Sequence, residues 1–180
     1  MEGYDTAIIA TGQTSAGKSY SIVGDEALTY KTRGMIARSM EHIFEVAEAQ
    51  PGTNFEVRFS VIEILNDKLI DLLAAQSASR KNADAVKQGP QLHEVNGKLQ
   101  IQNLTSIQLH NVSEGLELLF GAESCKSVGA NALNRASSRS HVIYLITVRQ
   151  SSRTDESAAM TESRLYLVDL AGSEKNISDQ

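Results

Sequence analysis

The chain has 180 residues, of which 41% are hydrophobic and 22% charged, and its formal net charge is -5. This length and composition suit one globular domain and exclude a disordered or fibrous protein. The acidic balance argues against a nucleic-acid-binding surface, because phosphate neutralisation needs clustered Lys and Arg. No apolar run approaches the ~20 residues that span a bilayer, and the N-terminus does not resemble a signal peptide. We therefore expect an intracellular protein without a membrane span.

Cysteine and histidine usage limits the metal and redox chemistry that the chain can perform. Cys125 is the only cysteine, so no internal disulfide can form, which fits a reducing compartment. We expect Cys125 to pack on the face of a helix. The histidines show no metal-ligand spacing; they are His42, His93, His110 and His141. The sequence therefore predicts neither a structural zinc nor a catalytic histidine pair.

The first half of the chain alternates short apolar runs with segments of helical period, which is typical of an α/β domain. The apolar run at 6–11 predicts a buried strand. A helix is predicted over 34–49, and the Gln-Pro-Gly at 50–52 should end it. Residues 55–65 alternate strictly between apolar and polar, which predicts a half-buried strand. The segment 67–73, DKLIDLL, predicts one or two helical turns.

The second half continues the same alternation. Residues 74–90 have no apolar periodicity and end in a Gly-Pro pair, which predicts a surface loop. Residues 98–111 predict a small β excursion, and a helix is predicted over 113–129, opened by the serine at its first position. Two further strands are predicted, one over 141–150 and one over 164–169, with a polar turn between them.

The stretch GQTSAGKS, residues 12–19, lies between the first predicted strand and a predicted helix. It matches the pattern G-x-x-x-x-G-K-[ST] through Gly12, Gly17, Lys18 and Ser19. The glycines let successive N–H groups turn toward phosphate oxygens, and the helix N-terminus adds partial positive charge. Lys18 should reach the β- and γ-phosphates, and the Ser19 hydroxyl should ligate Mg²⁺. The pattern predicts a nucleotide-phosphate site.

Two other stretches have residues suited to the same chemistry. Asp169 ends the last predicted strand, and ligands of open α/β sheets bind outside the carboxyl ends of strands. Asp169 should therefore face the phosphate loop and hold Mg²⁺ through water, while the Gly172 N–H senses a γ-phosphate. NRASSRSH, at 134–141, is rich in hydroxyls that can complete a Mg²⁺ shell. Within it, Arg139 has a natural carboxylate partner in Glu174.

Together these motifs resemble those of the kinesin motor family, and the segments between them follow the family's order over nearly the whole chain. GYDTAIIATGQTSAGKSYSIVG resembles the phosphate loop, NRASSRSH resembles switch I, and YLVDLAGSEK resembles switch II. The resemblance implies an α/β P-loop NTPase fold with a kinesin-like central mixed β-sheet flanked by helices, incomplete at both ends. The expected organisation is one partial motor domain over 1–180, with the phosphate loop at 12–19, switch I at 134–141, switch II at 169–174 and a surface loop at 74–90.

The resemblance also implies roles for single residues around the nucleotide. The residues expected to contact it are Gly12, Gln13, Thr14, Ser15, Ala16, Gly17, Lys18, Ser19 and Tyr20. Tyr20 stands where the family has an aromatic residue or histidine, and Ser19 stands where it more often has Thr. In switch I, the resemblance makes Ser138 the second Mg²⁺ hydroxyl, Ser137 a water-positioning group, and Asn134 a neighbour of the γ-phosphate.

Similarity to switch II implies the remaining catalytic roles. Arg139 would form a closing salt bridge with Glu174, and Glu174 would help to relay a proton from the attacking water. Gly172 would act as the γ-phosphate sensor, and Asp169 would hold Mg²⁺ through water.

The function implied by the resemblance is Mg²⁺-dependent ATP hydrolysis by a microtubule motor of the cytoplasm and cytoskeleton. Motor domains of the family extend further at both ends, so about half of the domain is expected to be absent from these residues. An alternative is a non-motor nucleotide-binding or interaction fragment that has lost the microtubule-binding half. A GTPase-like switch is disfavoured, since the sequence has no N-K-x-D guanine-reading motif.

Overall fold

The structure, a computed structural model, describes residues 3–25, 31–80, 89–95, 97–128, 139–155 and 157–174. The helices are α1 (Lys18–Ile22), α2 (Met35–Glu48), α3 (Leu72–Arg80) and α4 (Val112–Val128). The strands are β1 (Thr6–Ala10), β2 (Thr53–Leu65), β3 (Lys68–Asp71), β4 (Gln91–Val95), β5 (Lys98–Gln102), β6 (Ile107–Leu109), β7 (His141–Ser152) and β8 (Thr161–Asp169).

A mixed sheet of six strands forms the centre of the molecule, in the order β1-β8-β7-β2-β3, with β6 also paired to β2. β1 and β8 are parallel, whereas β8, β7 and β2 pair antiparallel. The parallel register places Ala10 opposite Asp169, so the two strands end at the same edge of the sheet. The expected mixed sheet flanked by helices is confirmed.

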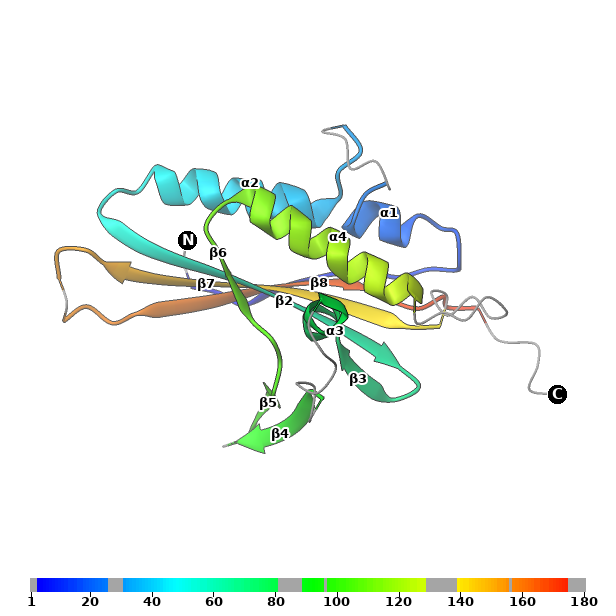
Figure 1. Cartoon of the computed structure of the whole chain (residues 1–180). Helices are drawn as coiled ribbons and strands as arrows, with labels where there is room; N and C mark the ends of the chain where they lie inside the picture. The colour runs from blue at the N-terminus through cyan, green and yellow to red at the C-terminus, as the bar shows by residue number, and fades with distance from the viewer. Residues whose placement is uncertain are drawn as a thin grey trace.

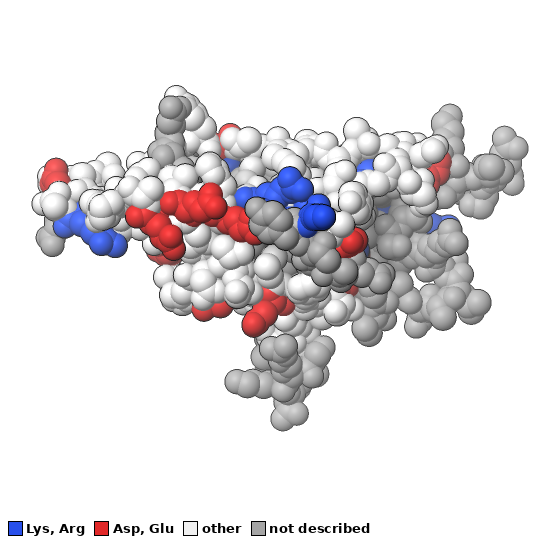
Figure 2. Space-filling view, turned by 90° about the horizontal axis from the view of Figure 1, so that it is seen from above, with Lys and Arg blue, Asp and Glu red and all other residues white. Residues whose placement is uncertain are grey.

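The described helices lie unevenly about the sheet. In Figure 1, α1, α2 and α4 lie over one face, and the β4–β5 hairpin projects on the opposite side. α2 buries Ile36, Ala37, Met40 and Ile43, as its apolar period predicts. Seen from above, charges of both signs gather next to one another on the molecule (Figure 2). Of the helices in the described ranges, none has the length and hydropathy needed to cross a membrane.

The apolar run at 6–11 forms a strand, as predicted, but this strand is not fully buried. β1 lies at the edge of the sheet and has only β8 as a neighbouring strand in the described part of the chain. Ile8 packs against the core, whereas the Ile9 side chain, which points to the other face, is 58% exposed. An apolar run specifies a strand, but its burial depends on what packs on each side.

The helical turns predicted over 67–73 are wrong in their first part. Asn66 and Asp67 have φ angles of 49° and 61°, which reverse the chain in a tight turn. The following residues then pair back on β2 as β3, with Asp71 opposite Ile62. The helical pattern and the hairpin compete here, and the two-residue turn favours the hairpin.

The loop predicted over 74–90 is also corrected in its first part, because α3 continues to Arg80. The Asp71 carboxylate accepts hydrogen bonds from the N–H groups of Leu73 at 3.0 Å and Ala74 at 2.9 Å. These bonds satisfy two of the free donors at the helix start. Residues 81–88 lie outside the described residues.

The helix predicted over 113–129 is confirmed as α4, but its cap differs from the prediction. The Asn111 side chain, rather than Ser113, accepts the N–H of Glu114 at 2.9 Å. The Glu114 carboxylate in turn accepts the N–H of His110 at 2.9 Å, which completes a reciprocal cap. Cys125 lies half-buried on this helix and packs against the core, as predicted.

β2 is buried more fully than its alternating sequence predicts. Val57, Phe59 and Val61 are buried on one face as expected. Ser60 and Ile62, on the other face, are also only 3% and 1% exposed. The middle of this central strand is therefore covered on both faces, and the half-buried prediction is wrong there.

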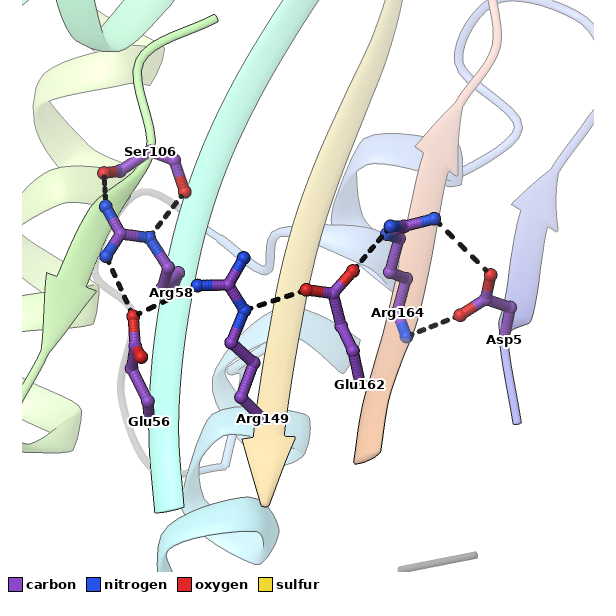
Figure 3. A network of polar contacts seen from close by, with 7 residues as sticks. All are labelled: Asp5, Glu56, Arg58, Ser106, Arg149, Glu162 and Arg164. Atoms are coloured by element: carbon purple, nitrogen blue, oxygen red, sulfur yellow. Dashed lines mark hydrogen bonds and ion pairs between the residues drawn. The ribbon is translucent and has the colours of Figure 1, made fainter. Parts of the chain in front are cut away.

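A network of alternating charges crosses the strands at the end of the sheet away from the β1–α1 loop (Figure 3). Arg149 contacts Glu162 at 2.7 Å, and Glu162 also contacts Arg164 at 2.5 Å. The network is completed by Asp5, Glu56, Arg58 and Ser106. The hydrogen bond from Arg149 lowers the pKa of Glu162, and the same bond raises the pKa of Arg149.

This network predicts an acid-dependent contribution to stability. Because the folded pKa of Glu162 is lowered, its contribution is complete above the ordinary glutamate pKa and disappears as the pH falls through the lowered value. We expect Glu162→Gln to reduce the free energy of unfolding by about 0.5–1 kcal/mol at pH 7. Urea denaturation at several pH values should show this difference shrinking below about pH 4. Glu117→Gln, at an exposed position on α4, is the control; a constant Glu162→Gln difference from pH 7 to 3 contradicts the prediction.

A second prediction concerns the close contact between α1 and the start of α2. A Cβ atom on Gly34 would lie 2.4 Å from the carbonyl carbon of Val23, which is a backbone atom. Gly34→Ala should therefore lower the free energy of unfolding by about 1–3 kcal/mol, since the backbone must shift to admit the methyl group. Gly52→Ala is the matched control, because its Cβ would meet no atom within 4 Å. Denaturation of both variants is monitored by circular dichroism. Equal midpoints for Gly34→Ala and Gly52→Ala would contradict the predicted steric overlap with the Val23 backbone.

Candidate functional site

The loop between β1 and α1 is curled by three residues with positive φ. These angles are 142° at Gly12, 66° at Ser15 and 88° at Gly17. Within residues 12–17 of the described chain, acceptors are found only for the amides of Thr14 and Ala16. The other loop N–H groups are thus available to an anionic ligand, as in a backbone nest.

Lys18 folds back over this loop. Its ammonium group donates hydrogen bonds to the carbonyl oxygens of Gly12 at 2.9 Å and Gln13 at 2.8 Å. No carboxylate among the described residues forms a salt bridge with Lys18. Its positive charge is therefore held at the loop by neutral acceptors.

Ser19 and Asp169 are brought together at the edge where β1 and β8 end. The Ser19 hydroxyl donates a hydrogen bond to Asp169 Oδ2 at 2.5 Å. Asp169 is only 6% exposed, and its Oδ1 has no hydrogen-bond partner in the described structure. Buried carboxylate oxygens normally have a partner. A hydroxyl beside this oxygen is a donor set that suits a hard cation such as Mg²⁺, or its water ligands.

The segment after β8 runs alongside the loop. The Leu170 N–H donates to the carbonyl oxygen of Ala10, and the Ser173 N–H to that of Gly12, both at 3.2 Å. Between them, Gly172 lies so close to Glu174 that a Cβ atom would come within 2.4 Å of its Oε1. The absence of a side chain at position 172 therefore allows the Glu174 carboxylate to turn back toward the loop.

Glu174 makes its contacts with the loop residue Thr14. One carboxylate oxygen accepts the Thr14 N–H at 2.9 Å, and the other accepts the Thr14 hydroxyl. The hydroxyl bond is the main cause of the lowered pKa of Glu174, and the charge of Lys18 contributes. Two donors of the loop are thus engaged by a carboxylate of the same chain.

The expected ion pair between Arg139 and Glu174 is not formed in this structure. Among the described residues, no salt bridge to Arg139 is found, and its side chain is exposed. Both carboxylate oxygens of Glu174 are instead engaged by Thr14. The sequence does not predict the contact with Thr14, because nothing in the motif spacing shows that position 174 reaches the loop.

His141, the last residue of the expected switch I, is a further contact residue, although the sequence analysis assigns it no individual role. Its Nδ1 accepts the N–H of Ala171 at 3.2 Å, which requires an unprotonated Nδ1. The first residue of β7 therefore holds the backbone next to Gly172. Beside it, Ser140 is 3% exposed, and its hydroxyl has no partner within the described ranges.

The remaining predicted residues divide into two groups. Tyr20 lies on α1 with its side chain 55% exposed, close in sequence to the loop. Asn134, Ser137 and Ser138 lie outside the described residues, so the structure places none of them.

The contact between His141 and Ala171 predicts a local change in hydrogen exchange. His141→Ala removes the acceptor, and the Ala171 amide should then exchange about 2- to 10-fold faster, in line with the loss of one hydrogen bond. NMR-detected exchange measures this residue by residue. His141→Asn, whose side-chain oxygen can accept in place of Nδ1, is the control and should retain most protection. Unchanged exchange in the alanine variant would show that the contact does not hold the backbone.

Comparisons with known proteins show which family this chain resembles. The family model described as Kinesin motor domain matches residues 1–180. The chain is 33% identical over 177 residues to Kinesin-like protein KIN-14N of Oryza sativa subsp. japonica, covering 97% of this chain and 23% of that protein. It is 36% identical over 176 residues to the Kinesin heavy chain of Gibberella moniliformis, covering 97% of this chain and 18% of that protein.

A solved structure is also similar to this chain. It is described as "Structure of a fast kinesin: Implications for ATPase mechanism and interactions with microtubules" and superposes with a TM-score of 0.85 at 33% identity. The match covers 99% of this chain and 48% of the solved chain. The chain thus spans about half of that structure, and about a quarter or less of the curated relatives named above.

Proposed function

Because the chain belongs to the kinesin motor domain family, we propose that it forms the nucleotide-binding part of a microtubule motor that hydrolyses ATP with Mg²⁺. The observation that supports this most directly is the meeting of Lys18, Ser19 and Asp169 where β1 and β8 end. A lysine ammonium, a hydroxyl and a buried carboxylate beside a curled loop are the groups that a nucleoside triphosphate and its metal need.

The phosphates of ATP would be held by the loop at 12–19, with Tyr20 next to it. The unengaged N–H groups of this loop and the Lys18 ammonium group provide hydrogen-bond donors for the negatively charged phosphate oxygens. The Thr14 N–H is bonded to Glu174, so a phosphate that uses this donor must displace the carboxylate. The ring of Tyr20, which is largely exposed, would be free to offer its face to the base.

Mg²⁺ would be held by the Ser19 hydroxyl and, through water, by Asp169, with Ser138 as the expected second hydroxyl. The unpartnered Asp169 Oδ1 beside Ser19 is consistent with this assignment. When bound, the ion neutralises charge on the phosphate oxygens.

Hydrolysis would depend on the segment that carries Gly172 and Glu174. The Thr14 hydroxyl bond lowers the pKa of Glu174, so the carboxylate is ionised while it is held at the loop. Once released from Thr14, it would lose this bond and would be free to accept a proton. We assign Gly172 the role of γ-phosphate sensor, because its N–H lies on the backbone that runs beside the loop. In switch I, Ser137 and Asn134 would position water and phosphate, and Arg139 would pair with Glu174 in the closed state.

For a complete motor domain of this family, the family membership supports movement along microtubules, in the cytoplasm and on the cytoskeleton. This chain matches 48% of the similar solved structure, so we assign it the nucleotide site, within one partial motor domain. Similarity to kinesins over 97% of the chain favours the motor over the non-motor alternative.

A titration with a fluorescent ATP analogue in the presence of Mg²⁺ tests the proposed function. Lys18→Ala should weaken binding about 10- to 100-fold, because it removes a charge-assisted contact while the backbone donors remain. Lys68→Ala, at an exposed position on β3, is the matched control and should bind like the wild type. Wild-type affinity in Lys18→Ala would overturn the phosphate-loop assignment.

The metal assignment is tested in the same titration by comparing Mg²⁺ with EDTA. In the wild type, Mg²⁺ should strengthen binding. In Ser19→Ala this gain should largely disappear, since the variant lacks the proposed hydroxyl ligand. A full Mg²⁺ effect in Ser19→Ala would contradict the metal assignment without affecting the phosphate assignment.

A further inference from the structure

Two buried polar atoms lie without a partner at the same end of the central sheet. Ser140, directly before β7, is 3% exposed, and its hydroxyl has no hydrogen-bond partner within the described ranges. The Oδ1 atom of Asp169, at the end of β8, is likewise unpartnered there. Because buried polar groups are normally bonded to protein or to ordered water, both atoms require an explanation.

The sheet register places these two side chains on one face. Val142 on β7 pairs with Asp169, so their side chains point to the same side of the sheet. Burial alternates over residues 139–144, with Ser140, Val142 and Tyr144 buried in turn. Ser140 is therefore on the face of Asp169, as its diagonal neighbour, at about 7–8 Å. The structure has no direct bond between them, and one water molecule can bond to both at this spacing.

A third buried polar side chain borders the same place. Glu63 on β2 pairs with Val142 from the other side and is also buried. Val142 thus lies between the two carboxylates, and Ser140 is a diagonal neighbour of both. A water molecule here has three polar neighbours, which is within the two to four that a buried water needs.

The neighbouring tyrosine indicates that both carboxylates act on this face. Burial, followed by the negative charge of Glu123, raises the pKa of Tyr144 well above its ordinary value, and Asp169 and Glu63 act in the same direction. The Tyr144 hydroxyl donates to Glu123 on α4, so it donates to neither of these two carboxylates. The donor nearest to both along β7 is therefore the Ser140 hydroxyl.

We propose that Ser140 is a positioning residue of the metal site and holds Asp169 through one bridging water molecule. Ser140 donates to the water, and the water donates to Asp169 Oδ1 and to Glu63. Asp169 Oδ2 accepts the Ser19 hydroxyl, so both carboxylate oxygens are fixed. Oδ1 keeps a second lone pair for a water ligand of Mg²⁺. The inference rests on the proposed function, and the carboxylate orientation that it describes is the one that metal-bound water would meet.

The first measurement uses the free protein, without nucleotide or metal. Ser140→Ala removes the donor, so in urea denaturation it should raise the equilibrium constant for unfolding about 3- to 10-fold, as for the loss of one hydrogen bond. In the Asp169→Ala background the same change should raise it less than about twofold, because the bridge has already lost an acceptor. A hydroxyl that has no partner predicts the opposite, since its removal would leave stability unchanged or increase it.

Two serine variants provide the controls. Ser60→Ala is matched in burial, because Ser60 is also 3% exposed, but it lies on the other face of the sheet, opposite Leu145. It should have equal effects in both backgrounds. Ser140→Cys keeps most of the volume but donates poorly, so it should resemble Ser140→Ala. A cysteine variant with wild-type stability would contradict the proposal, and this comparison replaces the double variant if Asp169→Ala does not fold.

The second measurement compares nucleotide affinity with Mg²⁺ and with EDTA, using the fluorescent ATP analogue. In Ser140→Ala, affinity with Mg²⁺ should fall about 3- to 10-fold, and affinity in EDTA should stay within about twofold. A purely structural role would weaken both alike or neither. Ser60→Ala should change neither affinity selectively.

The outcomes separate this inference from the proposed function. Equal effects of Ser140→Ala in the two backgrounds overturn the bridge, whether or not the wild type binds nucleotide. Coupling in the free protein with an unchanged Mg²⁺ effect in Ser140→Ala overturns the positioning role alone. A wild type that does not bind the analogue overturns the proposed function and the positioning role with it, while the free-protein comparison still decides the bridge.

Discussion

The parallel pairing of β1 with β8 is the constraint on which the candidate site depends. It places Ala10 opposite Asp169, so the curled loop after one strand meets the segment after the other. The backbone bonds from Leu170 and Ser173 to the start of the loop follow from this register. A shift by one residue would turn Asp169 away from Ser19, because side chains alternate between the two faces of a strand.

Much of the fold can be predicted because periodicity reports local structure. The apolar patterns predict the helices α2 and α4 and the strands β7 and β8, and each is present near its expected bounds. The pattern fails where a few residues decide the path, as at Asn66 and Asp67, whose φ angles turn a helical sequence into a hairpin. It also fails for Ile9, since burial depends on neighbours that periodicity does not report.

The candidate site can be predicted only in part, for a related reason. Fixed spacing identifies Lys18 and Ser19, because the loop chemistry requires these residues in sequence order. The contacts that Thr14 and His141 make with residues 171–174 join positions far apart in the chain, and no spacing rule contains them. The buried pair of Tyr144 and Glu123 is harder still to foresee, since the tyrosine lies in a strand whose pattern indicates only a core position.

If the loop binds a phosphate as proposed, the contact of Glu174 with the loop would make that binding an exchange between two anions. The Thr14 N–H and hydroxyl are engaged by a carboxylate tethered in the same molecule, so a ligand that needs them must compete with a high local concentration of negative charge. Small anions that bind through one or two donors compete poorly with such a group. Under the proposed function, a ligand that also engaged Lys18 and a metal at Ser19 would gain additional contacts with which to displace the carboxylate, so Glu174 would favour polyvalent phosphates over simple salts.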